Sequence, residues 1–481
     1  MINFKIIFSH LSRILIILSI VMCIPMLYAF ITVSKGGAEF LAGALITFLI
    51  GMVVMHITRS RRETMTIKDM FLFTTLMWVT MVVFAAIPIY LIMKEDLLSS
   101  CIETAAALST SGNTVIGNVD LIPKAILIWR SILQYLGGIG FIAVGIIVLP
   151  SLNVGGMKLF STESSKESTD KVIPTSRNLA FSMLLTYLAL TALAFFIYFF
   201  LGMTSFDAFN HALTSLATGG MSTHQSSMNY FPVKIHWAVI IFMFLGALPF
   251  PLVFAAIRGR VKELFNDAQV KAFIVMIIGV SIATTLSLIC SEHYNLTDAT
   301  RIALFNTVSV LSTTGYSLED YSGYNDFITL LFFFLIPLGA CSSSTSGGLK
   351  IFRIQIAFTL FRRQINQLMH PNAIFPQKYN NQPVNDVIIR SIITFFCAYF
   401  IIAIASSLLL CLGGLGLLDA ISSTLSCLSN LGIGIGPTVG PNGDFSALTD
   451  YQKIILCFDM LTGRLEVLTV LICFMPSFWK V

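Results

Sequence analysis

The sequence has little charge and lacks the patterns on which most soluble enzymes depend. Charged residues make up only 11% of its 481 residues and hydrophobic residues 56%, whereas soluble domains average about 25% charged residues. No HExxH, GxSxG or Walker A motif occurs, and the seven histidines are scattered. These absences argue against a soluble enzyme and make an intramembrane enzyme a remote alternative.

The cysteines form no CxxC pairs, and the basic residues form no single cluster. None of the nine cysteines belongs to a CxxC pair, and all lie in or beside apolar segments. They predict neither a zinc site nor a disulfide framework, and we interpret them as small buried hydrophobic residues. The net charge of +5 is distributed over short loops, so no nucleic-acid partner is expected.

Long apolar runs fill most of the chain. In hydrocarbon only a helix or a closed barrel satisfies the backbone, and no run shows the strict alternation of a barrel strand. Windows of about 20 residues therefore predict ten spanning helices, at 12–33, 38–57, 68–93, 125–150, 178–203, 235–257, 272–291, 327–350, 388–412 and 452–478.

Four further apolar segments are too short and too rich in Ser, Thr and Gly to span; they lie at 97–118, 206–223, 298–317 and 419–436. Lys and Arg in short loops stay on the cytoplasmic side. If all four segments re-enter from outside, 21 of these residues lie inside and seven outside. A full crossing by any of them would break this bias, so re-entry is the favoured interpretation.

The short segments belong to an internal repeat of span, re-entrant segment and span. They align without gaps as Leu108–Gly112 (LSTSG), Leu216–Gly220 (LATGG), Leu311–Gly315 (LSTTG) and Leu428–Gly432 (LSNLG), and their last glycines are 108, 95 and 117 residues apart. One unit of about a hundred residues thus occurs four times. The predicted organisation is two extra helices in 1–63, then repeats at 64–160, 161–262, 263–365 and 366–481.

The repeated turns suggest a cation site built from the backbone. A helix that ends near the middle of the membrane presents unpaired carbonyls and the negative end of its dipole. The turns contain no charged side chain, which favours carbonyl coordination over a ring of acids. Glycine would permit the unusual backbone at Gly112, Gly220, Gly315 and Gly432. We interpret Gly137, Gly138 and Gly140, by contrast, as sites of close helix packing.

Other titratable residues have supporting roles in this interpretation. Glu103 and His211 lie within the short segments and are expected to be buried polar groups that support the turns. Acidic residues at the starts of these segments are predicted helix N-caps; they are Asp96, Asp207, Asp298 and Asp419.

Four motifs occur together in one family of membrane proteins. They are Thr218–His224 (TGGMSTH), Ser312–Tyr316 (STTGY), Ser344–Lys350 (STSGGLK) and Thr462–Glu466 (TGRLE). On these motifs the sequence resembles, over essentially its whole length, the TrkH family of bacterial potassium uptake proteins in the Trk/Ktr/HKT superfamily. The two extra N-terminal helices are the feature that distinguishes this family from its shorter Ktr relatives.

The resemblance implies a fold and a set of filter residues. The fold is an all-α integral membrane protein of the bacterial inner membrane, with ten transmembrane helices and four re-entrant pore loops around a single pore. K+ is the implied transported ion. The implied filter comprises Thr110, Ser111, Gly112, Thr218, Gly219, Gly220, Thr313, Thr314, Gly315, Asn430, Leu431 and Gly432.

Two filter turns depart from the family pattern. Ser111 stands where Thr is usual, and Ile433 stands where Pro often follows the glycine. In the plant HKT relatives a Ser in place of the first filter glycine accompanies sodium selectivity. Gly112 occupies that position here, so the resemblance favours potassium.

The segment from Gly339 to Gly348 is a predicted break in a spanning helix. Three glycines and five hydroxyl residues in ten positions cannot form a stable lipid-facing helix; a plain kinked helix is the alternative. The resemblance implies a loop beneath the filter that obstructs the closed pore. The implied gate comprises Gly339, Cys341, Ser342, Ser343, Ser344, Thr345, Ser346, Gly347, Gly348 and Arg464.

Arg464 is a charge inside an apolar span. Such a charge costs about 2.5–3.5 kcal/mol on insertion scales, so it must face the interior of the bundle. The resemblance implies that it lies at the pore beneath the filter and repels permeating cations. A pair with Asp459 or Glu466 is the alternative explanation.

The resemblance also implies partners. Proteins of this type form homodimers in the lipid bilayer and are regulated by a cytosolic ring of nucleotide-binding TrkA-type subunits. The segment 351–390, with Arg362, Arg363 and Lys378, is the candidate contact, although positive-inside topology explains these charges equally well. Proton-coupled symport and a sodium-permeable member of the superfamily remain open, whereas a transporter with two inverted repeats fits four parallel repeats poorly.

Overall fold

The computed structural model describes residues 2–58, 65–94, 96–147, 176–373, 375–380, 382–441 and 443–480. Two predicted boundaries, 63/64 and 160/161, lie outside these residues, as does most of the predicted inner loop at 151–177. The described chain is almost entirely helical. It also contains one short antiparallel hairpin, β1 (Lys378–Tyr379) and β2 (Gln382–Pro383).

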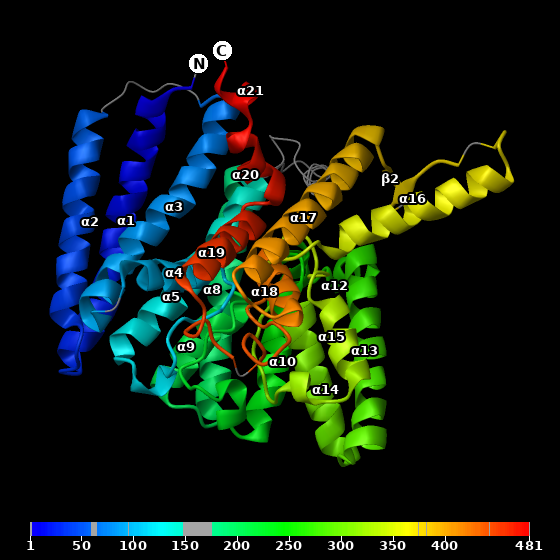
Figure 1. The fold of residues 1–481 in the computed structure, drawn as a ribbon, viewed down its shortest axis with the longest axis horizontal. Helices are drawn as coiled ribbons and strands as arrows, with labels where there is room; N and C mark the ends of the chain where they lie inside the picture. Colours follow the sequence, from blue (N-terminus) through cyan, green and yellow to red (C-terminus); the bar gives the residue numbers. More distant parts are fainter. Residues whose placement is uncertain are drawn as a thin grey trace.

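Two long helices precede the repeats. The helices α1 (Phe4–Ile31) and α2 (Gly37–Ile57) pack against each other and against α3 (Ile67–Met93) at one edge of the bundle (Figure 1). The Asn3 side chain caps α1 by accepting from the Ile6 amide. Thr66 and Asp69 form a reciprocal capping box at the start of α3, which satisfies amides that the first turn leaves unpaired.

Each repeat begins with a long helix followed by a short one. The long helices are α3, α8 (Ser176–Phe200), α13 (Ala268–Glu292) and α17 (Asp386–Leu412). The short helices are α4 (Leu97–Leu108), α9 (Ser205–Leu216), α14 (Leu296–Leu311) and α18 (Leu417–Ser429). Each short helix contacts the long helix before it. With 12 to 16 residues, at about 1.5 Å per residue, the short helices cannot cross about 30 Å of hydrocarbon.

The second spanning segment of three repeats is broken. After α5 (Lys124–Ile147) in the first repeat, the second has α10 (Val233–Ala247) and α11 (Phe250–Ile257), bent by 111°. The third has α15 (Asp326–Leu335) and α16 (Ile351–Met369), and the fourth has α19 (Asp450–Arg464) and α20 (Val467–Phe474). The short helix α12 (Val261–Asn266) links the second repeat to the third, and α21 (Pro476–Trp479) lies near the C-terminus.

The sequence windows overestimated the continuity of these segments. They predict unbroken spans at 235–257 and 452–478, but the backbone is interrupted at Leu248–Pro249 and at Glu466, where φ is +60°. Pro249 has no amide hydrogen to continue α10. Within the described residues six helices are long and apolar enough to cross a membrane, or seven with the bent pair. The total of ten stays a prediction.

The repeats are arranged around a common centre. The second segment of a repeat contacts the short helix of the next one: α5 contacts α9, α10 contacts α14, and α19 contacts α4. The last of these contacts joins the fourth repeat to the first. One continuous hydrophobic core runs through all four repeats. Loops also contain three 3-10 turns, η1 (Val119–Leu121), η2 (Ser227–Tyr230) and η3 (Tyr321–Gly323).

Candidate ion pathway

All four short helices end in the same backbone conformation. The residue that closes each one has a positive φ, of 58° at Thr110, 50° at Thr218, 56° at Thr313 and 53° at Asn430. The next amide donates back to a helix carbonyl, as from Ser111 to Ala106 at 2.9 Å. This left-handed conformation costs about 1–2 kcal/mol for a residue with a Cβ. Such strain persists only where the surroundings impose it, and the sequence did not predict it.

Two residues further on, each turn has a glycine in the left-handed region. The φ values are 84° at Gly112, 73° at Gly220, 82° at Gly315 and 88° at Gly432. A β-carbon added to Gly112 would lie 2.3 Å from the Gly219 oxygen, and one added to Gly220 would lie 2.0 Å from the Thr314 oxygen. A β-carbon added to Gly315 would lie 2.1 Å from the Leu431 oxygen, and one added to Gly432 would lie 1.9 Å from the Ser111 oxygen. Each turn therefore touches the next, and the fourth touches the first. The structure brings all twelve residues of the predicted filter into one closed ring.

Polar side chains hold the carbonyls of this ring. The Gln134 amide donates to the Gly219 oxygen, and the Asn113 amide donates to the Gly432 oxygen at 2.9 Å. A carbonyl oxygen has two lone pairs, so one remains available on each. Glu103, fully buried, accepts from the Val115 amide at 2.9 Å and pairs with the Arg130 guanidinium at 2.7 Å.

His211 supports the turn of the second repeat. Its two ring nitrogens lie 2.8 Å from the Asp207 carbonyl oxygen and 3.0 Å from the Ser222 hydroxyl. The ring is fully buried, so it fixes the start of the helix relative to the chain that leaves the turn. Of the four predicted acidic N-caps only Asp96 occupies the cap position; the caps of α9, α14 and α18 are Thr204, Asn295 and Gly416.

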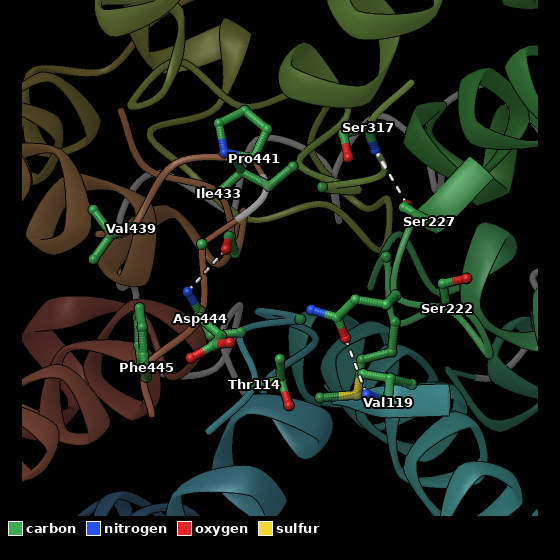
Figure 2. A pocket seen from close by; sticks show the side chains of 18 of the residues that line it. Thr114, Val119, Ser222, Ser227, Ser317, Ile433, Val439, Pro441, Asp444 and Phe445 are labelled. Carbon is green, nitrogen blue, oxygen red and sulfur yellow. Dashed lines mark hydrogen bonds between the residues drawn. The ribbon is translucent and has the colours of Figure 1, made fainter. Parts of the chain in front are cut away.

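A cavity of about 90 Å³ lies directly above the ring. Gly112, Gly220, Gly315 and Gly432 all line it. Figure 2 shows side chains from every repeat around this cavity, among them Thr114, Ser222, Ser317 and Phe445. The ring is therefore approached through a small mouth that all four repeats share.

The chemistry of the ring is that of oxygen donors. In the described ranges no group of three or more His, Cys, Asp or Glu side chains could hold a metal ion. Carbonyl and hydroxyl oxygens suit alkali and alkaline-earth cations. The C-terminal ends of four helix dipoles converge here, which adds partial negative charge. The arrangement can replace the hydration shell of a cation without fixing a charged ligand beside it.

The segment between α15 and α16 is an irregular loop beneath the ring. Gly339 and Gly348, with φ of 69° and 74°, lie against each other at its neck. The Thr345 hydroxyl lies 2.9 Å from the carbonyl oxygens of both Leu216 and Gly246. The Gly347 amide donates to the Thr313 hydroxyl at 2.7 Å. The loop is thus held against the second and third predicted filter turns. The alternative prediction of a plain kinked helix is wrong, because α15 ends at Leu335 and α16 begins only at Ile351.

Arg464 joins this loop to the first repeat. It is 1% exposed and ends α19. Its guanidinium donates to the Thr345 carbonyl at 2.8 Å and to the Gly137 carbonyl at 3.0 Å. Of the two acids weighed as its partners, Glu466 pairs with Arg353 at 2.6 Å and Asp459 accepts from Ser406 at 2.8 Å.

Two further buried cations lie beside the loop. The Lys350 ammonium donates to the backbone and side-chain oxygens of Ser346, and Arg353 forms the pair with Glu466. Both side chains are 1% exposed or less. Sequence reasoning counted Lys350 and Arg353 among the inner positive charges and did not predict their burial. Their place directly after a Gly-Gly break was the available signal.

The comparisons with known proteins agree with this geometry. The model of the TrkH family, described as cation transport protein, matches residues 36–481. The Trk system potassium uptake protein TrkI of Halomonas elongata is 38% identical over 97% of this chain and 95% of its own length. TrkH of Escherichia coli K12 is 31% identical over 99% of this chain and 100% of its own.

A solved structure supports the same relationship. The crystal structure of the potassium transporter TrkH from Vibrio parahaemolyticus matches with a TM-score of 0.91 and 30% identity, and each chain is covered completely. The relatives are named for transport. The family match spans most of the chain, and the fold agrees over all of it. The chain is a multi-pass membrane protein and belongs to the TrkH family of cation transport proteins.

Proposed function

We propose that this protein carries potassium into the cell through one pore at the centre of its four repeats. The observation that carries the proposal is the closed ring of filter turns, in which each glycine abuts a carbonyl of the next turn. Backbone oxygens from 110–112, 218–220, 313–315 and 430–432 would replace the water that K+ sheds. The names of the relatives, potassium uptake proteins, support the choice of ion.

The loop and Arg464 act as the gate of this pore. The loop contacts the second and third filter turns, and Arg464 ties it to the first repeat through Gly137. A buried guanidinium below the filter repels a permeating cation, since their charges interact strongly where water is scarce. Opening requires the loop to move away from the carbonyls of Leu216 and Gly246.

The chain functions as a homodimer in the bacterial inner membrane, with a cytosolic nucleotide-binding ring of the TrkA type as its regulator. In this arrangement ten segments cross the membrane and four re-enter it. The helix α16 extends away from the body of the chain (Figure 1), and its Phe358, Phe361 and Leu368 are 65%, 62% and 73% exposed. Apolar side chains on a projecting helix favour contact with a second copy. The nearby Arg362, Arg363 and Lys378 are the proposed contacts for the cytosolic regulator.

Ion flux in liposomes tests the proposed transport. Purified protein is reconstituted, and uptake of rubidium as a potassium tracer is measured with potassium or sodium as competitor, with and without a proton gradient. We expect potassium to compete and sodium to compete weakly. Equal competition by sodium would favour the sodium-permeable alternative. Flux that requires a proton gradient would favour symport.

The oligomeric state tests the proposed assembly separately. Multi-angle light scattering in mild detergent should give the mass of a dimer for the wild type and of a monomer for Phe361→Glu. Phe334→Glu is a matched control, because Phe334 is 63% exposed on α15 rather than on the projecting helix. A monomeric wild type would contradict the dimer without affecting the proposed pore.

A further inference from the structure

A second cavity lies among α1, α3, α4 and α5, on the side of the bundle opposite to α16 (Figure 1). It has a volume of about 170 Å³. Four helices form its walls: α1, α3, the short helix α4 and α5. Its lining is almost wholly apolar and includes Ile17, Trp78, Leu108, Gly137 and Gly140.

The cavity connects the outer face of α1 with the back of the filter. Ile17 is 59% exposed, and its neighbours along the same helix, Ile20 and Ile24, are 62% and 49% exposed. In a membrane-spanning helix such a face meets hydrocarbon. At the inner end of the cavity, Trp78 and Leu108 are 2% and 1% exposed. Leu108 ends the short helix directly before the first filter turn.

We infer that this cavity binds an acyl chain of a bilayer lipid. Apolar cavities of about 150 Å³ stay dry and take up apolar molecules, and the medium in contact with Ile17 is hydrocarbon. The lining residues lie near the middle of α1, α3 and α5, a depth that lipid tails reach and headgroups do not. The occupant is therefore a hydrocarbon tail that enters between the helices, and the site recognises no headgroup.

Gly140 is the residue that leaves room for this occupant. A β-carbon added to Gly137 would lie 1.8 Å from the Leu108 oxygen, and one added to Gly138 would lie 2.7 Å from the Tyr187 hydroxyl. These two glycines are packing sites, as predicted. A β-carbon on Gly140 would meet, among the described atoms, only the Trp78 ring at 4.0 Å. Among the described atoms Gly140 thus has no close backbone contact of the kind that Gly137 has, and it borders the cavity.

The occupant would touch α5, the helix whose Gly137 carbonyl accepts a hydrogen bond from Arg464. Gly137 lines the cavity, and its carbonyl accepts a bond from Arg464. An acyl chain in the cavity thus packs behind the segment that positions Arg464 and the Thr345 loop. Binding itself does not depend on the proposed transport function, so the two can be tested independently.

Quenching of tryptophan by brominated lipid tests the inference. The protein is reconstituted in phosphatidylcholine brominated near the middle of its acyl chains, and the quenched fraction of fluorescence is compared with that in unbrominated lipid. The chain has four tryptophans, so Trp78→Phe isolates the one in the cavity. If bromine reaches Trp78, Trp78→Phe removes a quenched component and the quenched fraction falls. Trp129→Phe removes a fully buried indole outside the cavity, and the fraction should rise.

Gly140→Leu fills the cavity and should lower the quenched fraction below that of Trp78→Phe, because the Trp78 indole then still fluoresces but is shielded from bromine. Gly279→Leu is the matched control, because Gly279 lies on α13 and an added β-carbon there meets no described atom within 4 Å; its quenching should equal that of the wild type. Gly140→Ala adds one methyl group and should give a smaller decrease in the quenched fraction. This variant keeps the test possible if Gly140→Leu fails to fold. A quenched fraction that rises in Trp78→Phe, or that both Gly140 variants leave unchanged, would overturn the inference.

Discussion

Replacement of Gly315 by alanine is the sharpest test of the filter ring. The added methyl group would lie 2.1 Å from the Leu431 oxygen, whereas a β-carbon needs at least 3.0 Å. The neighbouring turn must therefore move its carbonyl out of the ring. The φ of +82° at this position adds about 1–2 kcal/mol of strain for alanine. Both effects act on the site where the ion would be coordinated.

The expected result is a large loss of ion flux in a protein that still folds. If the displaced carbonyl raises the barrier for the ion by ~1.4 kcal/mol, flux falls about tenfold; a larger displacement reduces it further. Rubidium uptake into liposomes measures this change. The unfolding temperature should decrease only modestly, because the long helices and their core are unchanged.

Gly323→Ala is the control for this variant, since no atom of the described residues lies within 4 Å of the added carbon and the residue lies in the η3 turn. Its flux should match the wild type. Wild-type flux in Gly315→Ala, measured on protein with an unchanged size-exclusion profile, would refute the argument that the four turns coordinate the ion by their carbonyls.

Three other predictions concern the gate and the filter support. Arg464→Ala removes the donor to the loop carbonyl of Thr345 and to the Gly137 carbonyl on α5, so basal rubidium flux should rise; unchanged flux would show that the arginine is structural. Thr345→Val leaves the buried carbonyls of Leu216 and Gly246 without their hydroxyl partner, which should cost about 1–3 kcal/mol of stability. The unfolding temperature should therefore fall and basal flux should rise. Thr345→Ser keeps the hydroxyl and should restore both. Glu103→Gln uncouples the buried Arg130 and should cost about 3–5 kcal/mol of stability; Glu103→Gln with Arg130→Gln should cost less than the sum of the single variants, and an additive result would contradict a direct pair.

The four-fold repeat was predictable because its signal is local and occurs four times. The Leu-x-x-x-Gly register identified the turns, and the structure gives each glycine a positive φ. The motifs Thr218–His224 and Ser344–Lys350 identified the family, and the comparisons confirm it. Buried helix packing gives no such signal. Nothing in the sequence distinguishes Gly137, which touches a carbonyl, from Gly140, which borders open space.

The breaks in the second segments were only partly predictable. Three glycines within ten residues indicate an interruption between 339 and 348, because glycine is a poor helix former. The break at Glu466 lies between Gly463 and Val467, which are weak helix formers, but neither of them requires a positive φ at Glu466. Its carboxylate pairs with Arg353, 113 positions away. Tertiary contacts therefore impose this break, and a hydropathy window cannot detect them.

Glycines of the second segments bring the proposed filter and the proposed gate close together in the bundle. Gly137, Gly246 and Gly463 each allow a close approach to the leucine carbonyl near the end of a pore helix: Leu108 for Gly137, Leu216 for Gly246 and Leu428 for Gly463. This contact places the backbone of the second segment just beneath the filter. There the carbonyls of Gly137 and Gly246 accept bonds from Arg464 and Thr345. Because the same backbone packs on the short helices and binds the proposed gate, we expect a displacement of the loop to shift the proposed filter turns.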